Sequence, residues 1–213
     1  FAGRFPANRA ILRVPTFSEA ITLIQGMNES TGRNVGVYVE PKSPAWHQRE
    51  GKNLMAEVVR ELDEFGYGGR DDRAFLQSFD LDELKYARHE LNSDLKLIQL
   101  IGENGWRESP TDFDYLQTEA GLAEIASFAD GIGPWLPQVV ALSGENIGQP
   151  TGLVVAAHRH SLQVHAYTLR ADQIPPAIGT LDAALDILLG PVQLDGVFTD
   201  HADQVIQYLE AFR

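Results

Sequence analysis

Short apolar runs alternate with amphipathic segments along most of the chain. The runs are rich in β-branched residues, which is typical of strands buried on both faces of a sheet. They predict six strands, at residues 35–39, 74–79, 95–101, 130–134, 163–169 and 196–199. Between these runs, apolar residues recur every three or four positions, which predicts helices.

Polar residues indicate where several of the helices begin and end. Thr16 and Glu19 have the spacing of a capping box, which predicts a helix that starts after Thr16 and stops near Gly26. Asp80 and Glu83 repeat this spacing before another helix. Further helices are predicted from about residue 51 to 65 and over residues 120–128, 153–160, 181–189 and 202–212.

Each predicted strand is followed by a helix or a helical turn, which predicts an α/β fold with a parallel sheet. Two topologies fit this repeat: an open, doubly wound sheet, or a barrel. No glycine-rich phosphate-binding motif follows the first strand, which weakens a dinucleotide-binding interpretation. Because the chain has no internal repeat, low-complexity tract or linker, residues 1–213 are expected to form a single domain.

The composition and net charge of the chain limit the kinds of partner and site that it can have. The chain has 213 residues, 44% of them hydrophobic, which is enough for a substantial core. Its net charge of −13 repels polyanions, so we expect no nucleic-acid partner, and anionic membrane surfaces are disfavoured. The absence of cysteine excludes disulfides, thiolate metal sites and a cysteine nucleophile. No apolar run approaches the roughly 18 residues that a membrane-spanning helix needs.

The first strand ends in Glu40-Pro41-Lys42, which brings a carboxylate and an ammonium to one place. Side chains two positions apart project from the same face of a strand, so Glu40 and Lys42 should point the same way. The carboxyl end of such a strand carries the chemistry in a parallel α/β barrel. A carboxylate suits a hard cation and a lysine suits a phosphate, although a surface ion pair at an ordinary strand end is the alternative.

Other polar and aromatic residues at strand ends should gather at the same site if the sheet forms a barrel. They are Gln77, Phe79, Gln99, His165, Tyr167, Arg170, Thr199 and Asp200. His165 and Tyr167 share one face of their strand, where a buried core histidine and an aromatic core residue are the alternatives to ligand contacts. Trp46 and Trp135 follow strands and could either line a pocket or pack on the rim.

Six segments, in this order, resemble the glycerophosphodiester phosphodiesterase family, in particular its bacterial periplasmic type. They are YVEPK (38–42), LQSFD (76–80), LIQLI (97–101), ADGIGP (129–134), VHAYTLR (164–170) and DGVFTD (195–200). WHQREGK at 46–52 and GRFP at 3–6 strengthen the resemblance to that type. Each motif is weak alone, but together they cover nearly the whole chain.

The resemblance implies a TIM-type (β/α)8 barrel of the phospholipase-C-like kind and hydrolysis of glycerophosphodiesters to an alcohol and glycerol 3-phosphate. It implies a divalent metal, Ca²⁺ first and Mg²⁺ as the alternative, with Glu40 as a metal ligand and Lys42 as the catalytic lysine that faces the phosphate. Tyr167 matches an aromatic position at the substrate pocket, and Gln77 and Phe79 match strand-end positions near it. A periplasmic or secreted location and a role in lipid and glycerol metabolism are also implied.

The chain departs from the family pattern at its beginning. In the family the first strand ends in His-Arg-Gly, the second ends in a Glu-x-Asp metal pair, and a second catalytic histidine follows. None of these strand ends is found here. Because a barrel that lacks two strands cannot close, we expect these residues to be the C-terminal part of a longer protein, with about six of eight βα units. The isolated chain is expected to be inactive.

Two other functions stay open. A non-catalytic barrel portion could act as a binding or interaction module, completed by a partner chain or a swapped segment. A different α/β-barrel hydrolase with coincidental strand ends is the other alternative. The sequence leaves open the preferred head group, the native metal and the oligomeric state, with a homodimer among the alternatives.

Overall fold

The computed structural model describes residues 13–211 of the chain, so the GRFP segment at 3–6 lies outside the described residues. The chain divides into two compact units, Phe1–Val37 and Tyr38–Arg213. The first unit contains α1 (Phe17–Thr31), and the second contains the sheet from Tyr38 onward together with the candidate site.

Helix α1 begins as predicted but ends later. The Thr16 hydroxyl accepts a hydrogen bond from the Glu19 amide at 3.2 Å, and the Glu19 carboxylate accepts one from the Thr16 amide at 2.8 Å, so the capping box is confirmed. The predicted stop at Gly26 is wrong, because α1 continues to Thr31 and ends at Gly32 in the left-handed conformation, at φ +64°. A glycine inside a helix costs only about 1 kcal/mol, which the remaining helical residues outweigh.

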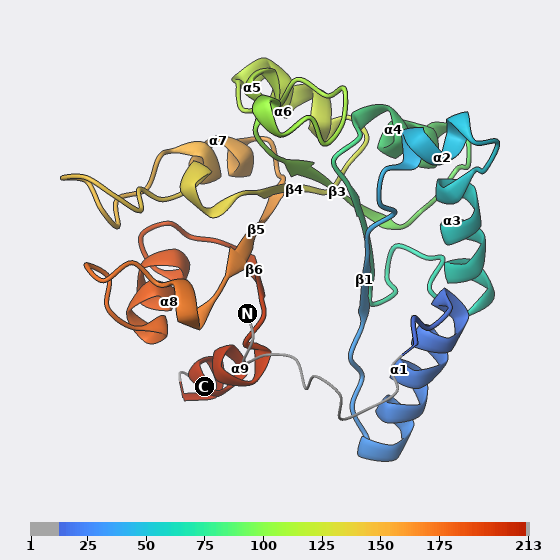
Figure 1. Ribbon diagram of the computed structural model, residues 1–213, viewed down its shortest axis with the longest axis horizontal. Helices are drawn as coiled ribbons and strands as arrows, with labels where there is room; N and C mark the ends of the chain where they lie inside the picture. Colours follow the sequence, from blue (N-terminus) through green and yellow to red (C-terminus); the bar gives the residue numbers. More distant parts are fainter. Residues whose placement is uncertain (1–12, 212–213) are drawn as a thin grey trace. The chain divides into compact units, whose positions relative to one another are not determined.

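The sheet has six strands, and their order in space is their order along the chain (Figure 1). They are β1 (Val37–Val39), β2 (Ala74–Ser78), β3 (Lys96–Ile101), β4 (Gly131–Pro134), β5 (Gln163–Leu169) and β6 (Gly196–Thr199). The pairs from β2 to β6 are parallel. A doubly wound sheet would reverse its strand order at a switch point, which this sheet does not do. The strands instead curl as part of a TIM-type α/β barrel.

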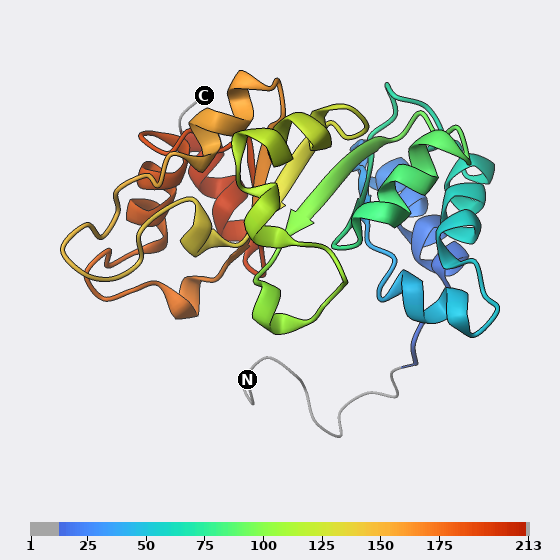
Figure 2. The ribbon, with the colours of Figure 1, turned by 90° about the horizontal axis from the view of Figure 1, so that it is seen from above.

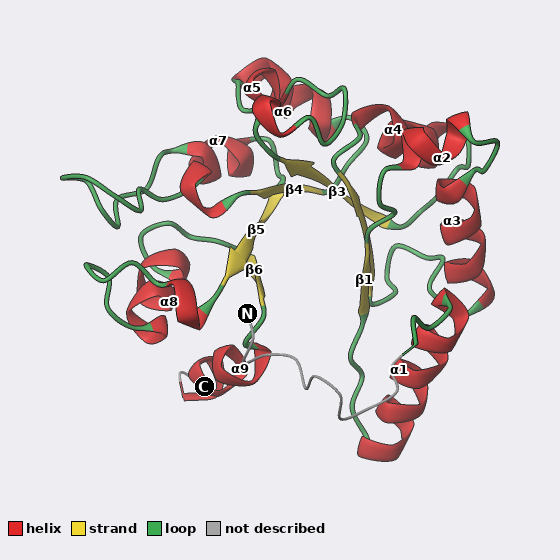
Figure 3. Ribbon diagram, in the orientation of Figure 1, coloured by secondary structure: helices red, strands yellow, loops and turns green. Residues whose placement is uncertain are grey.

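Helices lie outside the curl of the strands in the second unit (Figure 3). They are α2 (Pro44–Arg49), α3 (Leu54–Glu64), α4 (Leu81–His89), α5 (Phe113–Leu116), α6 (Glu119–Ala126), α7 (Leu153–Arg159), α8 (Leu181–Leu189) and α9 (Ala202–Ala211). Three 3₁₀ turns, η1 (Asn104–Trp106), η2 (Leu136–Gln138) and η3 (Ala171–Gln173), follow β3, β4 and β5. The loop that carries η1 projects beyond the end of β3 (light green in Figure 2). None of the helices among residues 13–211 has the length and apolar character needed to cross a membrane.

The start of α4 corrects a second capping prediction. Asp80 is the N-cap, as expected, and its carboxylate accepts hydrogen bonds from the amides of Asp82 and Glu83. Glu83 does not complete a capping box, since its carboxylate accepts a hydrogen bond from Gln48 of α2 at 3.4 Å instead. Helix α2 itself was not predicted from the sequence.

Two aspartates form hydrogen bonds that join the amino ends of neighbouring strands. Asp130 precedes β4 and accepts a hydrogen bond from the Leu97 amide of β3 at 2.9 Å. Asp195 precedes β6 and accepts one from the Val164 amide of β5 at 2.8 Å. The same arrangement therefore links β3 to β4 and β5 to β6 at the amino edge of the sheet.

Two glycines keep one face of β4 clear for the side chains of β3. A Cβ atom at Gly133 would lie 2.6 Å from Leu100 Cδ2, and a Cβ atom at Gly131 would lie 2.8 Å from Ile98 Cδ1. Real Cβ atoms do not approach other heavy atoms this closely. Glycine at these positions therefore gives Ile98 and Leu100 the space in which they pack.

Candidate active site

A pocket of about 190 Å³ opens at the carboxyl ends of the strands. It is lined by Glu40, Lys42, Gln77, Phe79, Leu100, Tyr167, Thr168 and Phe198. All five residues predicted as site residues are therefore in its wall, each within three residues of the end of a strand. Their gathering follows from parallel strands, which present their carboxyl ends at one edge.

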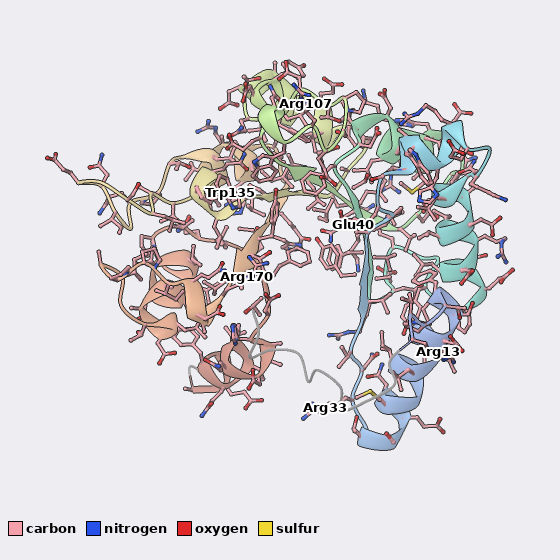
Figure 4. The ribbon with its side chains drawn as sticks, in the orientation of Figure 1. Arg13, Arg33, Glu40, Arg107, Trp135 and Arg170 are labelled. Carbon is pink, nitrogen blue, oxygen red and sulfur yellow. The ribbon has the colours of Figure 1, made fainter. Side chains whose placement is uncertain are left out.

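Glu40 and Lys42 project to the same side, as predicted, although β1 ends at Val39 and both residues follow the strand. Their side chains form an ion pair, with Lys42 Nζ 2.7 Å from Glu40 Oε1 (Glu40 is labelled in Figure 4). The Glu40 side chain is 18% exposed and that of Lys42 is 68% exposed. A pair with one exposed member adds little to stability, so the ammonium can turn to an anionic ligand at small cost.

Phe79 and Tyr167 form the aromatic wall of the pocket. Their rings meet edge to face, with centroids 5.9 Å apart. The Tyr167 hydroxyl donates a hydrogen bond to the Ile101 carbonyl at 2.8 Å, which fixes the ring. Burial raises the pKa of Tyr167, and the negative charges of nearby carboxylates, Glu40 foremost, raise it further. Tyr167 is therefore a neutral wall residue and not a base.

Two glutamines at neighbouring strand ends have different roles. Gln77 is buried but lines the pocket, and its Oε1 has no hydrogen-bond partner among the described residues. Gln99 does not line this pocket, and its Nε2 donates to the carbonyls of Ser78, Phe79 and Leu100 at 2.9–3.3 Å. Gln99, grouped with the site from the sequence, instead ties the end of β3 to the end of β2.

Other strand-end residues also lie outside this pocket. His165 is a core histidine, since its Nδ1 is 2.9 Å from the Tyr38 hydroxyl and burial lowers its pKa. Arg170 Nε donates to Asp200 at 2.7 Å, and Arg170 borders a separate, mostly apolar pocket. Thr199 accepts a hydrogen bond from the His201 amide. The expectation that all these residues share one site was wrong for these four, His165, Arg170, Thr199 and Asp200, since none of them lines the pocket and each already bonds to a neighbouring side chain or amide.

Three lining residues were missed by the sequence interpretation. Leu100, Thr168 and Phe198 border the pocket, but in the sequence they resemble ordinary core residues of their strands. All three lie in quoted motifs, Leu100 in LIQLI, Thr168 in VHAYTLR and Phe198 in DGVFTD, which is the one signal that could have drawn attention to them.

Two segments of the chain that resemble the missing family motifs lie away from the candidate pocket. Glu61-Leu62-Asp63 has the Glu-x-Asp spacing, but it belongs to helix α3 and not to a strand end. His158 and His160 lie on either side of Arg159, and each contacts a carboxylate. His158 Nε2 lies 2.9 Å from Asp195 Oδ2, and Asp195 is at the amino edge of the sheet. His160 reaches Glu119 at 3.0 Å. These residues therefore cannot serve the pocket.

The described residues do not complete a metal centre. Among residues 13–211, no group of three or more His, Asp or Glu side chains could hold a metal ion. Glu40 is the one carboxylate in the pocket wall, and it already pairs with Lys42. One carboxylate is far short of the six to eight oxygens that Ca²⁺ takes or the octahedron that Mg²⁺ requires.

The comparison with known proteins decides the family. Residues 2–204 match the Glycerophosphoryl diester phosphodiesterase family. The chain belongs to this family. The match confirms the resemblance inferred from the strand-end motifs, and it extends over all six strands of this glycerophosphoryl diester phosphodiesterase family member.

Relatives from distant organisms carry the corresponding name. A glycerophosphodiester phosphodiesterase of Haemophilus influenzae is 33% identical over 100% of this chain and 63% of its own length. One of Treponema pallidum is 28% identical over 98% of the chain and 63% of its own length. The family member described here thus spans less than two thirds of the length of these relatives.

Solved structures show the same fold. A crystal structure from Silicibacter pomeroyi, named for the same family, superposes with a TM-score of 0.62 at 19% identity. The match covers 95% of this chain and 59% of that one. A second, from Agrobacterium tumefaciens, has a TM-score of 0.58 at 17% identity and covers 93% and 65% of the two chains. At these identities the comparison supports the fold alone.

Proposed function

We propose that this chain is part of a metal-dependent enzyme that hydrolyses glycerophosphodiesters to an alcohol and glycerol 3-phosphate. The observation that carries the proposal is the Glu40–Lys42 pair at the mouth of a pocket with an aromatic wall. Family membership and the names of the two bacterial relatives support it.

Lys42 is the residue that acts on the phosphate. In hydrolysis, the oxygen of water forms a bond to phosphorus, the bond from phosphorus to the alcohol oxygen breaks, and the alcohol leaves with a proton. Negative charge on the non-bridging phosphoryl oxygens must be stabilised during this step. The exposed Lys42 ammonium can leave Glu40 to donate hydrogen bonds to those oxygens.

The remaining lining residues position the substrate. The rings of Phe79 and Tyr167 bound the organic part of the diester, and they exclude water from one side of the phosphate. Gln77, whose Oε1 lacks a partner, is suited to hydrogen-bond a substrate hydroxyl. This assignment gives Phe79, Tyr167 and Gln77 roles in substrate binding.

Glu40 is proposed as one ligand of a divalent cation, Ca²⁺ or Mg²⁺, that completes its coordination with groups beyond the described residues. Such a cation would neutralise phosphoryl charge. The described wall of the pocket also contains no histidine to move protons. We therefore propose that catalysis needs a longer protein that carries the His-Arg-Gly and strand-end Glu-x-Asp motifs.

The test is a kinetic comparison in that longer protein. Lys42→Met should lower kcat by about 10²–10³ and change KM much less, because it removes a contact that strengthens in the transition state. Glu40→Gln should weaken cation affinity, and excess divalent ion should partly restore its rate but not that of Lys42→Met. Lys52→Met, an exposed lysine outside the pocket wall, is the matched control and should keep the wild-type rate.

Three outcomes would contradict the proposal. A near-normal kcat for Lys42→Met, or its rescue by metal, would remove Lys42 from the reaction. Metal-dependent turnover of glycerophosphocholine by the Phe1–Arg213 chain alone would show that its own residues suffice. Binding of a glycerophosphodiester without hydrolysis by the longer protein would support a binding module instead.

A further inference from the structure

Two exposed tryptophans form a corner beside the candidate pocket. Trp106 ends η1 and Trp135 precedes η2, and their rings meet at 70° with centroids 5.2 Å apart. Trp106 is 44% exposed and Trp135 is 36% exposed. We call this pair the tryptophan corner; Trp135 is labelled in Figure 4. Large aromatic side chains that stay exposed side by side often mark a binding site.

The tryptophan corner is built on fixed turns. The Gln138 side chain accepts a hydrogen bond from the Trp135 amide at 2.8 Å and donates one to the Gly102 carbonyl at 2.7 Å. One amide group therefore joins the turn that carries Trp135 to the start of the loop that carries Trp106. The backbone turns that carry the two rings are held in place without a ligand, and the rings contact each other, which favours binding because less ordering is needed.

Each tryptophan adjoins one aromatic wall residue of the pocket. A Cβ atom at Gly102 would lie 3.0 Å from the Trp106 ring and 3.3 Å from the Phe79 ring, so these two rings pack around that glycine. Trp135 forms a parallel β-bridge with Tyr167 on the next strand. The tryptophan corner thus borders the aromatic wall of Phe79 and Tyr167 without lining the candidate pocket itself, and Trp135 also lines the apolar pocket that Arg170 borders.

The charges near the corner favour a cation. Glu103 precedes η1 and Glu108 follows Trp106 by two residues, and the charges of both reach Tyr167, where they help to raise its pKa. Of the nearby guanidinium groups, Arg170 is paired with Asp200. Arg107 lines a separate polar pocket together with Glu108, whose charge offsets its own, so Glu103 is the carboxylate that remains beside the corner. Aromatic faces in a negative field are the arrangement that binds quaternary ammonium groups.

We propose that the tryptophan corner binds the quaternary ammonium of a choline-type alcohol while the phosphodiester lies against Lys42. This inference rests on the proposed function and names its substrate class: glycerophosphodiesters whose alcohol carries a positive charge. Trp106 and Trp135 are then the residues that determine head-group preference. They touch the alcohol and take no part in breaking the bond to phosphorus.

The first test measures binding without catalysis. Choline and its uncharged carbon isostere, 3,3-dimethylbutan-1-ol, are titrated into the Phe1–Arg213 chain by NMR. Choline should saturate its signals and bind about tenfold more tightly than the isostere, because only choline has a cation for the rings. Trp106→Leu and Trp135→Leu should each lose most of this difference, and Trp106→Tyr should keep part of it. Trp46→Leu removes an exposed tryptophan elsewhere and should bind as wild type.

The second test measures preference in the longer, active protein. Trp135→Leu should lower kcat/KM for glycerophosphocholine about tenfold and leave that for glycerophosphoglycerol unchanged. Equal binding of choline and the isostere, or no choline binding by the wild-type chain, would overturn the inference. Choline binding that depends on the two tryptophans, in a protein without hydrolytic activity, would instead overturn the proposed function and leave the corner in place. Circular dichroism of each variant confirms that it is folded.

Discussion

Polar side chains make different contacts at the two ends of the parallel strands. At the amino end, Asp130 accepts a hydrogen bond from the Leu97 amide, lies 3.1 Å from Arg88 Nη2 and also pairs with Arg70. At the carboxyl end, Glu40 has Lys42 as its salt-bridge partner, and Lys42 is mostly exposed. Carboxylates at the amino end therefore stabilise the fold, whereas the polar groups of the pocket keep bonding capacity for a ligand.

This division follows the general behaviour of parallel α/β barrels, in which the carboxyl face carries the chemistry and the amino face carries stability. Here it can be traced to individual atoms. Asp195 repeats the Asp130 arrangement with the Val164 amide and with His158. The division predicts that mutations at the two ends affect different measurements.

The largest effect on stability is expected at the amino end. Asp130→Ala should lower the free energy of unfolding by about 3 kcal/mol, because it leaves the Leu97 amide and the partly buried Arg88 guanidinium without their carboxylate. Urea unfolding followed by circular dichroism measures the change. Asp94→Ala, at an exposed aspartate just before β3, should stay within about 0.5 kcal/mol of wild type. A similar small change for Asp130→Ala would break the contrast between the ends.

A smaller effect of the opposite sign is expected in the pocket. Gln77→Leu should leave the free energy of unfolding unchanged or raise it by up to about 1 kcal/mol, because its side chain makes no hydrogen bond to the described residues. The Oε1 of Gln99 is also unpartnered among the described residues, but its Nε2 donates hydrogen bonds. The matched change Gln99→Leu should lower it by about 1–2 kcal/mol, since three carbonyls lose their donor. Destabilisation of both variants to the same extent would show that Gln77 is structural.

The sequence predicted regular elements well where local signals were complete. The bounds of β5, α8 and β6 agree with the alternation and the caps that define them. The end of α1 was missed because a glycine inside a helix and a glycine at its end look alike in the sequence, and only the left-handed Gly32 ends this helix.

The candidate site was predictable only in part. Glu40 and Lys42 were placed on the same side correctly, but not for the reason given, since β1 ends at Val39 and the strand period of two does not extend to them. Gln77 and Gln99 could not be told apart, since the difference lies in which carbonyls each amide can reach. The meeting of Trp106 and Trp135 depends on Gln138, which joins two loops that are far apart in the sequence.

The smallest expected effect lies between the two ends of the strands, at His165. Burial lowers the pKa of His165, so below the ordinary histidine value near 6.5 the unfolded chain binds more protons at this site than the folded chain. Stability should therefore fall as the pH decreases from 7 to 5. His165→Phe should reduce this slope, as measured by urea unfolding at several pH values. An unchanged slope would mean that His165 accepts its proton in the folded protein as readily as in the unfolded one.

Gly133 influences the candidate pocket although it does not line it. It lies on β4 and is not among the lining residues, but it provides the space into which the Leu100 side chain of the pocket packs. A methyl group there would lie 2.6 Å from Leu100 Cδ2, so Leu100 would have to move and the wall of the cavity would change with it. A residue that does not line the pocket thus helps to set the shape of its wall.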